Sequence, residues 1–207
     1  MYVPKHFREE DLVELHAFMS GNPFALAISN QEGVPVASHI PVILQAEPGP
    51  YGQLLGHFAL GNSQWKTFDG SQEVLIIFQG PHAYISPSWY SEPAISVPTW
   101  NYAVVHAYGV PRLVEDPDDL MVLLGDQVHV FEGTDKPAWS LQPENEAMRK
   151  MTCGVVGFTM SITRLQGKYK LNQNRSLTDQ EQVVDQLETQ DDVSKGVAAL
   201  MRKRIAQ

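Results

Sequence analysis

The chain has 207 residues, of which 43% are hydrophobic and 19% charged, so it can bury one large core. Its formal net charge of −9 excludes a general attraction to nucleic acid unless a local basic patch overrides it, and direct DNA binding is doubtful. A single cysteine excludes a disulfide framework, and no apolar run is long enough to cross a bilayer. We therefore expect a cytoplasmic protein with no membrane partner.

About six strands are expected, with the helices as inserts between them and as a tail. Helical periodicity predicts a first helix over 8–19, and further helices over 117–130, over 143–151 and in the tail beyond 178. Alternating or continuous apolar runs predict strands at 24–29, 34–44, 54–60, 73–79, 100–115 and 155–170. Because the helices do not alternate with the strands, the pattern favours a mainly β fold, an antiparallel barrel or sheet with peripheral helices, over a doubly wound parallel sheet.

Histidines follow several predicted strands. His39, His57, His82 and His106 each lie on such a strand or just beyond it, so they are able to converge on zinc or iron or to serve as half-buried structural residues. Their spacing favours the structural interpretation, with no metal site. The sequence contains no GxGxxG, GxxxxGK[ST], HExxH, CxxC or GxSxG motif. Its acidic residues lie in runs that are typical of solvent-exposed faces.

Polar and aromatic residues dominate four stretches: GHFALGNSQWK, ISPSWY, PTWNY and KLNQNRS. They combine amides, hydroxyls, flat rings and a few cations, the mixture that binds a planar ligand with a phosphate group. Asn62-Ser63-Gln64 resembles a helix cap, and a helix start beside Lys66 suits a phosphate. The alternative is structural, with the tryptophans in the core and the amides in turns.

The same stretches resemble the PaiB-like family of FMN-binding negative transcriptional regulators. MYVPKHF, SHIPVIL, GHFALGNSQW, FQGPHAYISPSWY, VPTWNYAVVHAYG and KYKLNQNRS carry the resemblance, from residue 1 to about residue 176. It implies the FMN-binding split-barrel fold of pyridoxamine phosphate oxidases and flavin reductases. The expected architecture is a six-stranded antiparallel split β-barrel over 1–176 with a C-terminal helical extension over 177–207, packed on the barrel or on a dimer partner. The expected assembly is a homodimer with FMN at the subunit interface.

The resemblance also implies cofactor contacts. It places one group of residues near the ribityl phosphate, a second group near the ring or closing the cleft, and a third group as further anion contacts. The group near the ribityl phosphate is His39, His57, Asn62, Gln64, Trp65 and Lys66. The group near the ring or closing the cleft is Ser86, Ser88, Trp89, Thr99, Trp100 and Asn101. The further anion contacts are Gln173, Asn174 and Arg175. The chain departs from the family pattern at Leu60 and Gln180, where the pattern has arginines, which should weaken phosphate binding.

Three functions remain open at this point. The first is a flavin reductase or other oxidoreductase that uses bound FMN for electron or hydride transfer, with a small molecule or a free flavin as substrate. No catalytic residue is evident, although His57 and His82 are candidates for proton transfer. The second is a transcriptional regulator without catalysis, and the third is a haem-binding split barrel with His39 or His82 as an axial ligand.

Overall fold

The computed structural model describes residues 1–133 and 139–206, which fall into two compact units. Unit 1 contains 1–15, 79–105 and 166–207, and unit 2 contains 16–78 and 106–165. Helix α1 (Leu12–Gly21) and strands β5 (Val74–Ile85), β6 (Thr99–Gly109) and β9 (Arg164–Lys170) contribute residues to both units. Each unit is described by itself.

Unit 2 is built on an antiparallel sheet. Its strands are ordered β5-β2-β3-β4-β8-β7, with bounds β2 Phe24–Gln31, β3 Val34–Gln45, β4 Gln53–Ala59, β8 Val155–Ser161 and β7 Arg112–Leu113. β2 and β3 form a hairpin in which Ala27 lies opposite Ser38. Burial alternates along β2, because successive side chains of a strand point to opposite faces of the sheet.

Three phenylalanines form the centre of the unit 2 core. The rings of Phe58, Phe68 and Phe158 lie with their centroids 4.9–5.5 Å apart, in edge-on and tilted arrangements that aromatic pairs prefer. Gly56, opposite Phe158 in the register, has no room for a side chain, since an added Cβ would lie 2.6 Å from that ring.

Helix α2 (Pro117–Glu132) covers an outer part of the unit 2 sheet. Asp116 caps it by accepting hydrogen bonds from the backbone N–H groups of residues 118 and 119, and Pro117 begins the first turn. Leu123 of α2 packs against Ile43 of β3 and Leu55 of β4. Helix α3 (Glu146–Thr152) follows the undescribed residues 134–138 and is joined to α2 by the ion pair between Arg149 and Asp118.

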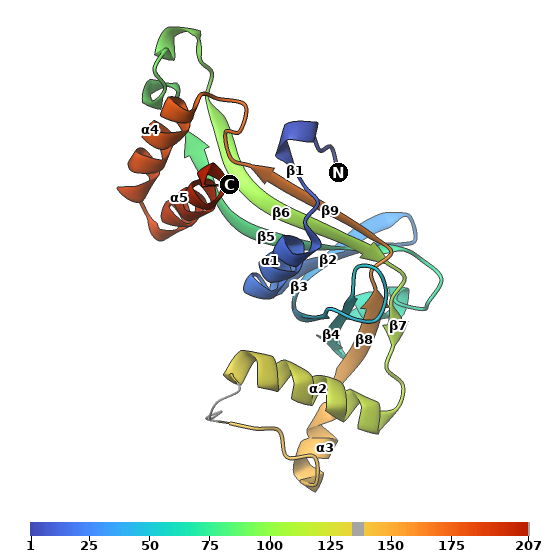
Figure 1. Cartoon of the computed structure of the whole chain (residues 1–207). Coiled ribbons are helices and arrows are strands. Elements are labelled where there is room, and N and C mark those ends of the chain that lie inside the picture. The colour runs from blue at the N-terminus through green and yellow to red at the C-terminus, as the bar shows by residue number, and fades with distance from the viewer. Residues whose placement is uncertain (134–138, 207) are drawn as a thin grey trace. The chain divides into compact units, whose positions relative to one another are not determined.

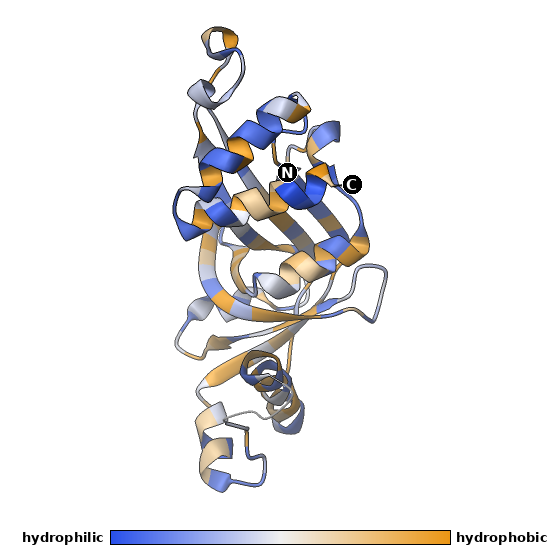
Figure 2. Ribbon diagram, turned by 60° about the vertical axis from the view of Figure 1, so that its left-hand side comes forward, coloured by the Kyte–Doolittle hydropathy of each residue, from blue (hydrophilic) through white to orange (hydrophobic). Residues whose placement is uncertain are grey.

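In unit 1, two C-terminal helices cover one face of a three-stranded sheet. The strand order is β9-β6-β5, and the two-residue strand β1 (Arg8–Glu9) pairs with β9 at the edge. Helices α4 (Leu177–Glu188) and α5 (Asp192–Ile205) bury Leu187 and Val197 and lie across these strands (Figure 1). Both helices alternate polar and apolar residues, as Figure 2 shows, because one stripe of each faces the sheet.

The predicted fold class is confirmed, with three differences in detail. The strand predicted at 155–170 is two strands, because Ile162 and Thr163 donate backbone hydrogen bonds to Gly52 and Tyr108 and the chain changes partners there. The first helix begins at Leu12 rather than at residue 8, since Arg8 and Glu9 pair with β9. The strand predicted at 100–115 is also two strands, β6 and β7, so that with β1 the described residues form nine strands instead of six.

Candidate functional site

A polar cluster joins β2, β3 and the short 3-10 helix η2 (Ser63–Thr67) in unit 2. Asn62 caps η2, its Oδ1 accepting from the backbone N–H of Gln64 at 3.1 Å, as the sequence predicts. Its Nδ2 donates to Ser38 Oγ on β3 at 2.8 Å. The amide of Asn62 therefore sets both the start of η2 and its position beside β3.

Gln64 ties the cluster to the sheet from within. Its side chain is 3% exposed, and its Nε2 donates to Ala27 O at 3.0 Å and to Val36 O and Ser29 Oγ, both at 3.2 Å. Its Oε1 is buried and has no hydrogen-bond partner among the described residues. A buried acceptor in this state carries a desolvation cost that a bound donor would remove.

Trp65 and Lys66 lie at the surface of the same cluster. Trp65 Nε1 donates to Leu60 O at 3.0 Å, which holds the indole against the preceding turn. Lys66 is exposed, its Nζ lies 5.8 Å from the indole centroid, and within the described residues it forms no ion pair. Lys66 therefore offers a free cation beside a flat ring.

His39 does not share this face. It follows Ser38 on β3, so its ring points to the opposite side of the sheet. There it stacks on the exposed ring of Phe24, with the centroids 5.9 Å apart.

His57 is also placed away from the cluster, against α2. Its Nδ1 lies 2.7 Å from Oε1 of the buried Gln127, whose Nε2 donates to Pro41 O and Leu55 O. Since Nε2 is the donor end of the Gln127 amide, its Oε1 can only accept a hydrogen bond. Nδ1 of His57 therefore carries the proton and donates it to Oε1. The contact is one of helix-to-sheet packing.

The predicted residues of unit 1 are divided between turns and strands. Ser86 caps the 3-10 helix η3 (Pro87–Trp89), and its hydroxyl lies 2.8 Å from that of Ser88. Trp89 is half-buried, and the loop that follows is fastened to α4 by a 2.8 Å hydrogen bond from Ser91 N to Asp179 Oδ1. This bond lowers the pKa of the Asp179 carboxyl.

Thr99, Trp100 and Asn101 begin β6 and alternate in direction. Asn101 is 0% exposed and directs Nδ2 toward Met201 Sδ of α5 at 3.4 Å. Trp100 lies on the other face and is 52% exposed. Thr99 Oγ1 and Trp100 O both accept from Lys170 Nζ. Asn101 and Trp100 therefore do not face one ligand.

The segment after β9 is held mainly by its own hydrogen bonds. Gln173 uses both ends of its amide, with Oε1 accepting from Leu171 N at 2.8 Å and Nε2 donating to Tyr169 O at 2.6 Å. The Arg175 guanidinium lies 4.3 Å from the ring centroid of Tyr90, and Asn174 is exposed. Gln173 is thus a turn residue, whereas Arg175 and Asn174 keep donors available.

The sequence interpretation missed two kinds of residue. Ser38 joins the cluster because it shares a face with Ile40, a signal present in the alternation of the second strand. Lys168 and Lys170 share a face of β9, which the pattern KYK already indicates. Burial and the neighbouring Lys168 lower the pKa of Lys170.

Metal ligands do not gather in the described part of the chain. Within it, no three His, Cys, Asp or Glu side chains are placed to hold an ion. The strand histidines therefore do not converge. Cys153, the single cysteine of the chain, is exposed.

The donor set of the unit 2 cluster fits a flavin nucleotide phosphate. It offers the ammonium of Lys66, the hydroxyl of Ser38 and the side-chain amide N–H groups of Asn62 as donors. The Oε1 of Gln64, which has no hydrogen-bond partner among the described residues, is an acceptor and does not suit a phosphate oxygen. Leu60, in place of the family arginine, is half exposed and contributes its carbonyl to Trp65.

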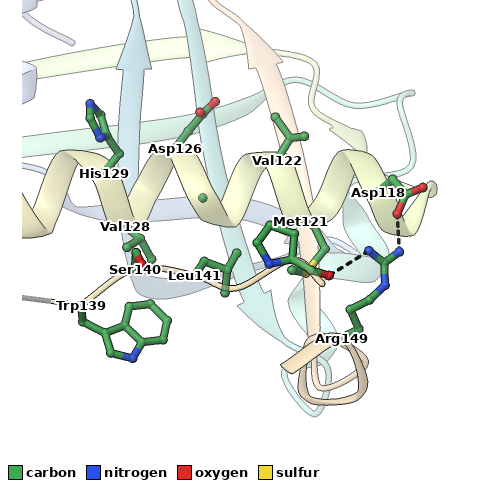
Figure 3. A pocket seen from close by; sticks show the side chains of 12 residues that line it. Asp118, Met121, Val122, Asp126, Val128, His129, Trp139, Ser140, Leu141 and Arg149 are labelled. Carbon is green, nitrogen blue, oxygen red and sulfur yellow. Dashed lines mark hydrogen bonds and ion pairs between the residues drawn. The ribbon is translucent and has the colours of Figure 1, made fainter. Parts of the chain in front are cut away.

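A separate cavity of about 470 Å³ lies elsewhere in unit 2, between α2 and residues 139–149 (Figure 3). Its apolar floor contains Met121 and Leu141, and Arg149 bridges one end by contacting Asp118 and Pro143 O. None of the predicted site residues lines it.

Comparison with known proteins places the chain in a class of flavin-binding proteins. Residues 1–164 match the family model "Putative FMN-binding domain". The chain is 37% identical to the "Protease synthase and sporulation protein PAI 2" of Bacillus subtilis (strain 168), over 99% of this chain and 98% of that protein. The chain belongs to the PaiB-like family with an FMN-binding domain.

Solved structures share the fold at low sequence identity. The flavocytochrome Anf3 from Azotobacter vinelandii superposes with a TM-score of 0.63 at 15% identity, covering 81% of this chain and 72% of that one. The FAD and heme binding protein from Mycobacterium smegmatis gives 0.62 at 12% identity, with coverage of 79% and 73%. Among the described residues, no helix is both long and apolar enough to cross a membrane.

Proposed function

We propose that this protein binds FMN and uses it for electron or hydride transfer, as a flavin reductase or related oxidoreductase. The observation that carries the proposal is the family match over 1–164, which includes the Ser38–Asn62–Gln64 cluster and the free cation of Lys66. FMN rather than FAD is favoured because the family is described by FMN and the cluster offers a compact phosphate site.

The unit 2 cluster is the proposed phosphate site. Lys66 would supply the charge, and Ser38 and Asn62 would supply neutral donors from a geometry that Gln64 holds in place. Bound flavin supplies the redox chemistry, while the chain binds and orients it. Ser88, Trp89 and Arg175 of unit 1 remain predicted contacts.

We also propose that the protein is a homodimer with the cofactor at the subunit interface. Support comes from the split-barrel class and from exposed apolar residues such as Phe24 and Ile95, which a single chain leaves in solvent. Sedimentation of the purified protein at several concentrations tests this directly, and a monomer at all of them would refute it.

Cofactor binding is tested by adding FMN to the stripped protein and following flavin fluorescence. The proposal predicts quenching that saturates at one FMN per chain and a yellow complex. A Soret band in the purified protein would instead favour haem, and absence of any quenching would refute FMN binding. Trp89→Ala with unchanged affinity would remove that residue from the site. Consumption of a reduced nicotinamide by the loaded protein then tests turnover.

The second candidate function is regulation without catalysis. It is favoured by the 37% identity with PAI 2 across nearly all of both chains, since that protein is named a protease synthase and sporulation protein. FMN binding without turnover of any reduced nicotinamide would favour this function over the first.

A further inference from the structure

The cavity beside α2 is not used by the proposed flavin site. It has a volume of about 470 Å³ and lies within unit 2, between α2 and residues 139–149 (Figure 3). This volume falls in the range of about 300–1,000 Å³ that is typical of small-molecule sites. None of the predicted flavin contacts lines the cavity, so a ligand bound there would be distinct from FMN.

Gly125 keeps part of this space open. Met121, Gly125 and Val128 are four and three positions apart, so they lie along one side of α2 and line the cavity. A Cβ added at Gly125 would meet no atom of the described residues within 4 Å outside the local helix backbone. Glycine within a helix costs stability relative to alanine, and no steric contact requires it here. A longer side chain at this position would therefore occupy the cavity.

The walls of the cavity are mostly apolar. Met121 and Val128 of α2 form one wall, and Trp139, Leu141 and Pro143 contribute the other. In Figure 3 the side chains of Trp139 and Leu141 lie on the side of α2 from which Met121 and Val128 project. The Trp139 side chain is 46% exposed, so flat apolar surface remains in contact with water. A ligand that covered this surface would gain binding free energy from the burial of apolar area.

The charged groups of the cavity are paired or directed away from it. Arg149 closes one end, where its Nη2 donates to the Asp118 carboxylate and its Nη1 donates to Pro143 O at 3.3 Å. In Figure 3 the side chains of Asp126 and His129 project from α2 away from residues 139–149. A ligand with a net charge would therefore find no free partner among the described residues, and its burial between apolar walls would be costly.

We propose that this cavity binds a small neutral aromatic molecule, with its ring between Met121, Val128 and the Trp139 indole. Such a ligand has the flat apolar surface that these walls complement, and it has no charge to desolvate. Ser140 also lines the cavity and adds a neutral hydroxyl that can form one hydrogen bond with the ligand. The proposal is independent of the FMN site, because the two sites share no residue.

The test is a titration of the full chain with N-phenyl-1-naphthylamine, a neutral aromatic probe whose fluorescence rises in apolar surroundings. A saturable rise at one probe per chain is expected. Gly125→Leu should weaken binding about five- to a hundredfold, because the added side chain occupies the cavity. The same variant should unfold at an equal or higher urea concentration, since leucine favours a helix more than glycine does. Trp139→Ala should weaken binding about two- to tenfold, because it removes one flat wall.

Matched controls are Phe131→Ala and Val130→Leu, which change exposed apolar residues of α2 outside the cavity lining. Both variants should bind the probe as the parent does. The anionic probe 8-anilinonaphthalene-1-sulfonate carries the same rings with a negative charge and should bind more weakly. Equilibrium dialysis with excess FMN should leave the amount of bound neutral probe unchanged.

The proposal is overturned if the neutral probe does not bind, or if Gly125→Leu and Trp139→Ala both bind it as the parent does. Tighter binding of the sulfonate would overturn the neutral class of ligand. Displacement of the probe by FMN would place the probe in the flavin site and so overturn the proposal as well. A change in sedimentation of the protein on Trp139→Ala would do the same, since the cavity residues would then form an interface between copies.

Discussion

The imidazole of His57 and the side-chain amide of Gln127 form a 2.7 Å hydrogen bond that joins β4 to α2. Gln127 is buried, and its Nε2 donates to two backbone carbonyls. The pair satisfies polar groups inside a helix-to-sheet contact whose apolar part is Leu123 against Leu55.

Replacing His57 by Phe should therefore reduce stability rather than cofactor affinity. The variant leaves Gln127 Oε1 buried without a donor, which costs about 1–3 kcal/mol in the free energy of unfolding. Urea unfolding measures this loss, and FMN titration should give the parent's affinity. A large loss of FMN affinity with unchanged stability would instead return His57 to the binding site.

Lys66→Met should weaken FMN binding about tenfold to a hundredfold, because it removes the free cation of the unit 2 cluster. The fold should be unaffected, since Lys66 is exposed and forms no ion pair in the described part of the chain. Flavin fluorescence quenching measures the affinity. Lys195→Met, which removes an exposed lysine of unit 1, is the matched control and should bind FMN normally. Equal affinities for the two variants would place the phosphate elsewhere.

Arg204→Met should destabilise unit 1 by about 1.5–3 kcal/mol, because it removes a charge-assisted bond from a buried carboxylate. Glu9 is 7% exposed, and its Oε2 accepts from Arg204 Nη1 at 2.6 Å while Oε1 accepts from the backbone N–H of residues 10 and 11. Lys203→Met is the comparison. It breaks a more exposed pair with Glu14 and should cost less than about 1 kcal/mol. Similar shifts in urea midpoint for both variants would contradict this account.

The His106 ring should make stability depend on pH. Burial lowers the pKa of His106 from 6.5 to about 4, so the folded chain holds the ring neutral where the unfolded chain protonates it. Stability should therefore be lost as the pH falls from 6.5 toward 4, because the unfolded state binds the extra proton. Urea midpoints across this range should fall less steeply for His106→Asn. Parallel slopes for the parent and the variant would show that other groups dominate.

Local periodicity and capping chemistry predicted most of the elements from the sequence, but not the short strands β1 and β7 or the break between β8 and β9. Asn62 caps η2 as predicted, and the apolar patterns of FALAIS and VPVASHIPVIL predict the strands β2 and β3. These signals depend on residues a few positions apart, so the sequence contains them. The family resemblance, carried by long unusual stretches, likewise needed no coordinates.

Only the tertiary structure decided which face each polar side chain occupies and what satisfies it. His57 forms a hydrogen bond with Gln127, 70 positions along the chain, and Gln173 forms hydrogen bonds within its own turn. Lys170 and Trp100 form one surface because β9 lies beside β6. Such pairings depend on strand order and on how distant elements pack, and the short-range pattern of the sequence carries no information about either.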